Sequence, residues 1–383
     1  MEVRPYTVSI PQAMLDDLNE RLAHTRWPDE IPATGWEYGA DLKYMTDLVE
    51  YWRTHFDWRA QERAINAFPH FRAIVDGVGI HCIHEKGRGP APIPIIITHG
   101  WPGSFLEMLR LIPLLTDPAS HGADPRDAFD VIVPSLPGFG FSDRPVQSGM
   151  SAFRIADLWA KLMDGLGYPR YGAQGGDWGA SVSTLLGLAY PANVLGIHLN
   201  FIPGSYLPYL GGSACNLSDA ERSFLKDMDE WAATEGGYWQ IQRTRPQTLA
   251  YGLTDSPAGL AAWIVEKFQA WSDCGGDVER RFTKDELLTN VSIYWFTQTI
   301  HSSCRLYFET RQRPLHFDEG QRVTVPCGIA HFPREAPFPP REWVERGYAV
   351  TRWSEMERGG HFAAMEEPDL LAMDIRAFFR AVR

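Results

Sequence analysis

An aspartate at the centre of a glycine-rich turn, in residues 175–179 (Gly-Gly-Asp-Trp-Gly), is the feature with the clearest chemical meaning. Residues 171–174 before it predict a short buried strand, and the segment from Ala180 predicts the start of a helix. Small residues around the tip permit the sharp turn of a nucleophile elbow. A carboxylate at that tip can attack an sp³ carbon and open a C–O or C–halogen bond, which leaves an alkyl ester that water must hydrolyse. The simpler alternative is an ordinary Gly-Asp turn.

Two further loops carry groups that such a nucleophile needs. Residues 99–102 (His-Gly-Trp-Pro) directly follow a strand-like run, where folds with an elbow place one backbone N–H of an oxyanion hole. The residue after the nucleophile supplies the other N–H, so the predicted donors are Trp101 and Trp178. His361 follows a double glycine after the last strand-like run, and it is the candidate general base for Asp177.

The base needs a carboxylate that fixes its tautomer and stabilises its charged form. Glu335 follows the strand-like run 325–332, at the end of the sheet where that role is expected. Asp318 and Glu319 precede the same strand and therefore lie at its wrong end. Glu342, in a proline-rich loop, is the remaining competitor. We predict Glu335 as the acid of the triad.

A leaving oxygen needs a hydrogen-bond donor, and tyrosine can serve because it keeps its proton at neutral pH. Any tyrosine is also a good packing residue, so side-chain chemistry alone does not choose among the candidates. The segment 203–317 contains six: Tyr206, Tyr209, Tyr238, Tyr251, Tyr294 and Tyr307.

The elements that must position these groups alternate between strand and helix. The continuous apolar runs at 93–98 and 131–134 predict strands buried on both faces of a sheet. Each is followed by a glycine-containing turn and then by a helical pattern, at 104–115 and 152–166. This alternation predicts an α/β fold with a mostly parallel central sheet and helices on both of its faces.

A length of 383 residues predicts one large core with added modules. Residues 1–70 read as an N-terminal extension that wraps the core, with helices at 11–23 and 42–56. An Asp-Gly turn at 76–77 predicts a hairpin at the start of the core. The four expected parts are the extension (1–70), the first part of the core (71–202), an inserted helical cap (203–317) and the second part of the core (318–383). In the cap we expect helices at 219–234, 260–271 and 284–305. In the second part of the core we expect strands at 323–332 and 349–356 and a helix at 368–381.

Composition excludes several classes of function. A net charge of −12 without a basic stripe argues against nucleic acid as a partner. The start of the chain has no hydrophobic run and no stretch is long enough to span a bilayer, so we expect a cytoplasmic protein without a membrane partner.

Five scattered cysteines without a C-x-x-C pair predict neither a disulfide framework nor a zinc site. We expect no metal and no cofactor.

Six segments resemble, over essentially the whole chain, motifs of the microsomal epoxide hydrolase family. They are residues 68–71 (Phe-Pro-His-Phe), 99–105 (His-Gly-Trp-Pro-Gly-Ser-Phe), 175–179, 255–260 (Asp-Ser-Pro-Ala-Gly-Leu), 287–291 (Leu-Leu-Thr-Asn-Val) and 359–364 (Gly-Gly-His-Phe-Ala-Ala). The resemblance implies the α/β-hydrolase fold and the hydrolysis of an apolar epoxide to a vicinal diol through an ester on the aspartate. Membrane-bound relatives begin with an anchor helix, and we expect none here because the first residues contain no hydrophobic run.

The same resemblance implies roles for particular side chains. Tyr238 and Tyr307 match the family's two tyrosines that polarise the epoxide oxygen, and Glu335 matches its acid after Phe-Pro. Aromatic residues near the motifs suggest a site for apolar aryl or alkyl epoxides. The predicted substrate-binding residues are Trp101, Pro102, Trp178 and Trp239.

Two other functions stay open from the sequence. A haloalkane dehalogenase would share the aspartate, the histidine and a tryptophan after the nucleophile, but would bind halide without paired tyrosines. A catalytically silent binding protein of the same fold is the alternative from a different class. The expected partners are a small epoxide and water, and the N-terminal extension leaves a homodimer open as the assembly.

Overall fold

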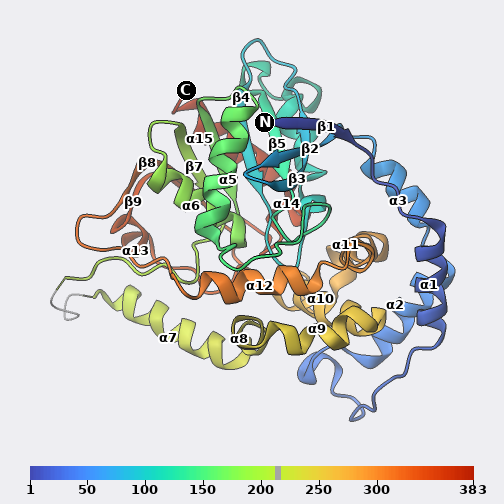
Figure 1. Ribbon diagram of the computed structural model, residues 1–383. Coiled ribbons are helices and arrows are strands. Elements are labelled where there is room, and N and C mark those ends of the chain that lie inside the picture. The colour runs from blue at the N-terminus through green and yellow to red at the C-terminus, as the bar shows by residue number, and fades with distance from the viewer. Residues whose placement is uncertain (212–216) are drawn as a thin grey trace.

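A nine-stranded sheet forms the centre of the computed structural model, which describes residues 1–211 and 217–383 (Figure 1). The strands lie in the order β1-β2-β3-β5-β4-β6-β7-β8-β9. The first three join the sheet antiparallel, and every pairing from β5 through β4 to β9 is parallel. The mostly parallel sheet expected from the sequence is therefore confirmed. The strands are β1 (Glu2–Tyr6), β2 (His70–Val75), β3 (Val78–Glu85), β4 (Ile93–Thr98), β5 (Phe129–Pro134), β6 (Tyr171–Gly175), β7 (Val194–Leu199), β8 (Val323–His331) and β9 (Tyr348–Glu355).

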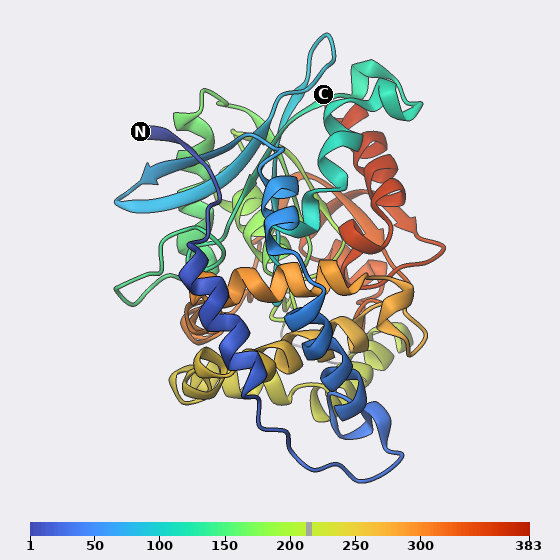
Figure 2. The ribbon, with the colours of Figure 1, turned by 90° about the vertical axis from the view of Figure 1, so that its right-hand side faces the viewer.

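Helices cover both faces of this sheet. Figure 2 shows the pair α5 and α6, in green, on one side and α4 and α15, in teal and red, on the other. The three central residues of β4, Ile95, Ile96 and Ile97, are completely buried, as a strand covered on both faces must be. The helices of the core are α4 (Leu111–Thr116), α5 (Ala152–Gly165), α6 (Asp177–Ala189), α13 (Arg341–Glu345), α14 (Ala363–Glu366) and α15 (Pro368–Arg380).

A second group of helices lies beyond the carboxyl ends of the parallel strands (Figure 1). It comes from the chain between β7 and β8 and consists of α7 (Asp219–Thr234), α8 (Gly237–Thr244), α9 (Pro246–Asp255), α10 (Pro257–Trp271), α11 (Lys284–Thr297) and α12 (Ile300–Thr310). Ligands of parallel α/β proteins bind at the carboxyl ends of the strands, so these helices lie over the edge where chemistry is expected.

The first 70 residues connect the edge of the sheet to these helices. After β1 the chain forms α1 (Gln12–Ala23), α2 (Leu42–Thr54) and α3 (Trp58–Ile65), which run down one flank of the molecule (Figure 1). Arg21 on α1 forms an ion pair of 2.9 Å with Asp255 at the end of α9. The hydroxyl group of Tyr51 on α2 donates to Asp285 Oδ1 on α11 at 3.0 Å.

Two strands went unrecognised in the sequence. β1 spans only five residues and pairs antiparallel with β2 at the edge of the sheet, where it is mostly exposed and shows no alternation of apolar and polar residues. β7 lies between β6 and β8 and is short. By contrast, the hairpin of β2 and β3 is confirmed, with Asp76 and Gly77 at φ values of 47° and 80° in its turn.

Two predicted helices are each broken into two pieces. The predicted helix 284–305 ends at Thr297, because Gln298 adopts a left-handed conformation with φ of 54°, and α12 starts at Ile300. The predicted helix 104–115 begins as a 3₁₀ helix, η2 (Phe105–Met108), and α4 starts only at Leu111. Apolar residues continue through the second break, so periodicity alone gave no sign of it. The residues at the first break, Thr297, Gln298 and Thr299, are polar but include no glycine or proline that would mark a helix end.

Within the described ranges, no helix is both long enough and apolar enough to cross a membrane. Four of the five cysteines, Cys82, Cys274, Cys304 and Cys327, lie in these ranges as buried free thiols. Cys215 lies outside the described residues.

Candidate active site

Asp177 lies at the sharp turn between β6 and α6, at the carboxyl edge of the sheet. Its φ of 46° is in the left-handed region, which is uncommon for a residue other than glycine and is typical of functional sites. A Cβ atom on Gly179 would overlap the backbone carbonyl of Thr98 in β4, and one on Gly176 would press against Asn200. The elbow therefore requires glycine at these positions, as the sequence pattern predicts.

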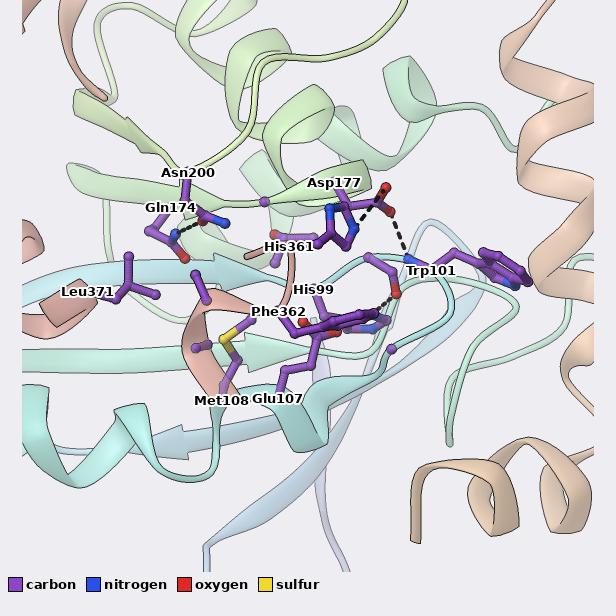
Figure 3. A pocket seen from close by; sticks show the side chains of 16 residues that line it. His99, Trp101, Glu107, Met108, Gln174, Asp177, Asn200, His361, Phe362 and Leu371 are labelled. Carbon is purple, nitrogen blue, oxygen red and sulfur yellow. Dashed lines mark hydrogen bonds and ion pairs between the residues drawn. The ribbon is translucent and has the colours of Figure 1, made fainter. Parts of the chain in front are cut away.

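The loop after β4 closes over the nucleophile. The backbone N–H of Trp101 donates to Asp177 Oδ1 at 2.7 Å (Figure 3). The backbone N–H of Trp178 also interacts with the carboxylate. A Cβ atom on Gly100 would overlap the same carboxylate, so glycine allows this close approach. Burial raises the pKa of Asp177, while the charge of His361 and the two N–H groups oppose that rise.

His361 and Glu335 complete a chain of hydrogen-bonding groups behind Asp177. His361 Nδ1 and Glu335 Oε1 are 2.7 Å apart, and His361 Nε2 is 3.7 Å from Asp177 Oδ2. The side chain of Glu335 is completely buried, and its Oε1 also accepts the N–H of Ala336 at 2.8 Å. Burial alone would lower the pKa of His361, but the neighbouring carboxyl groups of Glu335, Asp177 and Glu107 raise it to about 9.

The competing carboxylates lie elsewhere. Asp318 and Glu319 are exposed in the turn before β8. Glu342 accepts a hydrogen bond from the hydroxyl group of Ser218. Of the four carboxylates weighed from the sequence, the structure brings only Glu335 to His361.

Tyr238 on α8 and Tyr307 on α12 lie close to Asp177 from the helical side. Their rings meet edge to face with centroids 6.1 Å apart, and Trp101 stacks on Tyr238 at 5.3 Å. The ring of Trp178 meets Tyr307 edge-on at 4.8 Å. Burial raises the pKa of both hydroxyl groups. The nearby charge of Asp177 raises the pKa of Tyr238 further, and the neighbouring Tyr238 raises that of Tyr307 further. Both tyrosines therefore keep their protons at neutral pH.

The other four tyrosines of this segment have different surroundings. Tyr294 donates its hydroxyl hydrogen to the carbonyl oxygen of Gly103 at 2.7 Å, and Tyr206 donates to that of Trp343 at 3.3 Å. Tyr209 and Tyr251 are exposed. The structure therefore separates the two tyrosines implied by the family resemblance from those that pack or face solvent.

Asp177, Tyr238 and Tyr307 line a cavity of about 480 Å³ between the sheet and the helices above it, which we call the outer cavity. Most of the outer cavity wall is apolar, and its large members include Trp178, Phe201, Ile202, Phe224, Met228, Trp231, Trp239 and Trp343. Two of the predicted substrate-binding residues, Trp178 and Trp239, are in this wall.

The other two predicted substrate-binding residues are not in that wall. Trp101 is fully buried behind Tyr238 and lines a second, smaller cavity, which we call the inner cavity. Pro102 is buried, lines neither of these cavities, and its carbonyl oxygen accepts a hydrogen bond from Asn290 on α11 at 2.8 Å. Both residues support the loop that holds Asp177.

One ionisable group at this site was missed in the sequence. Glu107, on η2, points into the inner cavity together with Asp177 and His361 (Figure 3). Burial raises its pKa to about 8. Glu107 lies within the expected helix 104–115, where a glutamate is an ordinary residue. The sequence pattern therefore did not indicate that its side chain points toward Asp177 and His361.

Comparison with known proteins bears on what this arrangement does. Residues 3–108 match the family described as epoxide hydrolase N terminus, and residues 93–209 match the alpha/beta hydrolase fold. A relative from Stigmatella aurantiaca named "Putative epoxide hydrolase" is 47% identical, over 100% of this chain and 86% of its own length. Epoxide hydrolase 1 of Oryctolagus cuniculus is 39% identical, over 98% of this chain and 88% of its own length. The chain belongs to the epoxide hydrolase family.

Solved structures of epoxide hydrolases share its architecture. Juvenile hormone epoxide hydrolase from the silkworm Bombyx mori superposes with a TM-score of 0.85 at 32% identity, over 100% of this chain and 94% of that one. The Aspergillus niger epoxide hydrolase superposes with a TM-score of 0.85 at 31% identity, over 100% of this chain and 97% of that one. These findings confirm the α/β-hydrolase fold and the family predicted from the sequence.

Proposed function

We propose that this epoxide hydrolase opens an apolar epoxide to a vicinal diol through an ester on Asp177. One observation supports the proposal above all others. The carboxylate of Asp177 faces the same cavity as the partly buried Tyr238 and the buried Tyr307, and one of its oxygens is held by the backbone N–H of Trp101. In this proposal residues 203–317 form the cap that brings both tyrosines over the nucleophile.

The first half-reaction breaks a C–O bond of the epoxide. Because Trp101 holds Oδ1 of Asp177, the other oxygen, Oδ2, is the one free to attack a ring carbon. Tyr238 and Tyr307 donate hydrogen bonds to the epoxide oxygen as negative charge develops on it. Their raised pKa values favour donors that remain protonated until the oxygen needs a proton.

The second half-reaction hydrolyses the ester. His361, held by Glu335, takes a proton from water, and the water oxygen attacks Cγ of the esterified Asp177. The N–H groups of Trp101 and Trp178 stabilise the oxyanion, since Oδ1 is the oxygen that becomes negative. The bond between Cγ and the alkyl oxygen then breaks, so the diol of the first turnover carries an oxygen from Asp177.

The outer cavity supports a substrate class. Its wall is mainly aromatic and aliphatic, which favours aryl or alkyl epoxides without charge near the ring. Water is the second substrate. The cytoplasmic location expected from the sequence stays a prediction, and a homodimer stays open.

The test is diol formation from styrene oxide by the purified protein beside its Asp177→Ala variant. We expect diol from the parent and none above background from the variant. A single turnover in H₂¹⁸O should give diol without the heavy isotope, because the new oxygen comes from Asp177. Diol formation by the variant, or immediate labelling of the first diol, would contradict the covalent route.

A dehalogenase with the same nucleophile is distinguished in the same preparation. Release of halide from a short 1-haloalkane is the measurement. Replacement of Tyr238 and Tyr307 by phenylalanine should abolish epoxide opening, and it should leave halide release largely intact if dehalogenation were the activity.

A further inference from the structure

The inner cavity lies against both catalytic groups of the hydrolytic half-reaction. Its volume is about 20 Å³, and it is lined by Asp177 and His361 together with the polar side chains of Glu107, Gln174 and Asn200 (Figure 3). A space of this volume holds one water molecule, provided that polar groups bind it. Asp177 lines the outer cavity as well, so its carboxyl group separates the epoxide side from this polar space.

Glu107 is built into the wall of the inner cavity. A Cβ atom on Gly103 would overlap Oε1 of Glu107, so the loop after β4 needs a glycine there to admit the carboxyl group. The backbone N–H groups of Gly100 and Ser104 hydrogen-bond the carboxyl group. Its Oε1 is nevertheless buried without a hydrogen-bond partner within the protein. A buried oxygen of this kind calls for a partner.

Ester hydrolysis needs a water molecule held by two groups at once. One O–H bond must point at His361 Nε2, and one lone pair must face Cγ of Asp177. The water then has one O–H and one lone pair left. A carboxyl oxygen can accept a hydrogen bond from that O–H or, when it is protonated, donate one to that lone pair. Glu107 is near enough to both catalytic residues for their charges to affect its pKa.

We propose that Glu107 is the positioning residue for the hydrolytic water, and that the inner cavity is the site of this water. The inference rests on the proposed aspartyl ester. The water oxygen forms a bond to Cγ of Asp177 and gives its proton to His361 Nε2. The bond between Cγ and the alkyl oxygen then breaks, and that oxygen recovers the proton from His361 as the diol leaves. Glu107 makes and breaks no covalent bond.

A kinetic signature separates this role from a structural one. Loss of Glu107 slows ester hydrolysis but leaves the attack on the epoxide unchanged, so the ester accumulates. Both kcat and KM of Glu107→Ala should then fall together, on the order of ten- to a hundredfold, a loss no greater than that of a general base. The ratio kcat/KM reports the attack on the epoxide and should stay within about twofold of the parent. A collapsed site would instead lower kcat/KM.

Gln174 is the competing candidate. Its Oε1 is also buried without a partner, while its Nε2 donates to Asn200 at 2.8 Å. In Figure 3 the pair Gln174 and Asn200 lies at one end of the inner cavity, away from Glu107. Glu62 on α3 offers a control, because it is a largely buried glutamate far from the site. Its side chain accepts a hydrogen bond from the backbone N–H of Ile10 at 2.7 Å.

The experiment is rapid acid quench with styrene oxide, followed by intact-mass measurement of the protein and steady-state kinetics. We expect Glu107→Ala to carry the ester during turnover, Glu107→Gln to stay near the parent because the amide keeps an acceptor and a donor, and Glu62→Ala to lose stability without accumulating ester. Ester in Gln174→Ala but not in Glu107→Ala, or a fall of kcat/KM in Glu107→Ala without ester, would overturn the proposal. His361→Gln tests the mechanism beneath it. Ester in His361→Gln but not in Glu107→Ala refutes only the role of Glu107, whereas absence of ester in His361→Gln refutes the covalent route itself.

Discussion

At the scale of single residues, the charge balance around His361 would govern, in the proposed mechanism, when this side chain can activate water. Burial lowers the pKa of His361, but Glu335, Asp177 and Glu107 outweigh burial and raise it to about 9. A base acts only in its neutral form, so His361 is mostly protonated at neutral pH in the free enzyme. Formation of the proposed ester would remove the negative charge of Asp177 and so lower the pKa of His361 at the step where a base is needed.

This balance predicts two pH effects. Asp177→Ala should lower the pKa of His361 from about 9, measured by NMR titration of labelled histidine rings. In the parent, the rate constant for ester hydrolysis in single turnovers should rise with pH, because the neutral fraction of the base rises. The midpoint of that rise should lie below the pKa of the free enzyme. An unchanged pKa of His361 in Asp177→Ala would contradict this account.

Removal of either tyrosine should slow epoxide opening. Tyr238→Phe and Tyr307→Phe each remove one hydrogen bond to the leaving oxygen, and the expected loss in kcat/KM is on the order of a hundredfold for each. The measurement is the pre-steady-state rate of ester formation from styrene oxide. Tyr251→Phe is the matched control, because Tyr251 is exposed on α9 and should leave the rate unchanged. An equal effect of all three substitutions would rule out a specific role for the pair.

Most of the residues that the structure brings together here could be proposed from the sequence, because their positions depend on local geometry. Asp177 and His361 lie at turns that need glycine next to strand ends, and such turns are visible in the order of residues. The choice of Glu335 among the carboxylates depended on the predicted position of the strand before it. The choice of the two tyrosines depended on the family resemblance. Glu107 could not be found, because its role depends on the 3₁₀ turn of η2 and on the space left by Gly103.

At the scale of elements, the close contact between α6 and β4 sets the position of Asp177, the proposed nucleophile. Gly179→Ala would place a Cβ atom into the carbonyl of Thr98, so α6 must move away from β4. We expect a loss of about 1–3 kcal/mol in the free energy of unfolding, measured by urea denaturation, and a large loss of activity. Gly252→Ala on α9 is the control, because no atom lies within reach of its added Cβ. That substitution should be neutral or stabilise by about 0.5–1 kcal/mol.

Strands and helices were predictable where burial imposes a pattern and not where backbone geometry overrides it. The buried runs of β4 and β5 and the helices α5 and α15 were expected within a residue or two of their ends. At the break between α11 and α12, Gln298 has a left-handed backbone between Thr297 and Thr299, and glutamine is not a residue typical of such a turn. β1 is held by pairing at a sheet edge, not by burial, so its residues show no periodicity.

At the scale of the whole molecule, the loop after β4, which contains the proposed oxyanion-hole donor Trp101, is hydrogen-bonded to the helices above the sheet. Asn290 on α11 donates to the carbonyl oxygen of Pro102 and accepts the hydroxyl hydrogen of Ser104, both at 2.8 Å. Tyr294, one turn further along α11, donates to the carbonyl oxygen of Gly103. Tyr51 on α2 donates a hydrogen bond to Asp285 on the other side of α11. Displacement of α11 therefore moves the N–H of Trp101 relative to Asp177.

Asn290→Leu tests this connection. The leucine has a similar volume, but it leaves the buried carbonyl of Pro102 and the hydroxyl group of Ser104 without these partners, which should cost about 1–3 kcal/mol in the free energy of unfolding. We expect both half-reactions to slow, since Trp101 serves the attacking carboxylate and the later oxyanion, and a misplacement of about 1 Å can cost a hundredfold in rate. Quenched-flow measurement of ester formation and ester decay would resolve the two steps.

Tyr51→Phe separates the local tie from general loosening of the cap. It removes one partly buried hydrogen bond on the opposite side of α11, with an expected cost of about 1 kcal/mol, and should leave both rate constants near those of the parent. Slow kinetics in Tyr51→Phe would mean that the whole extension, and not Asn290 alone, sets the position of the loop. Parent-like kinetics in Asn290→Leu at reduced stability would mean that contacts with the sheet hold the loop in place. In that case the cap would supply only the tyrosines and the cavity wall.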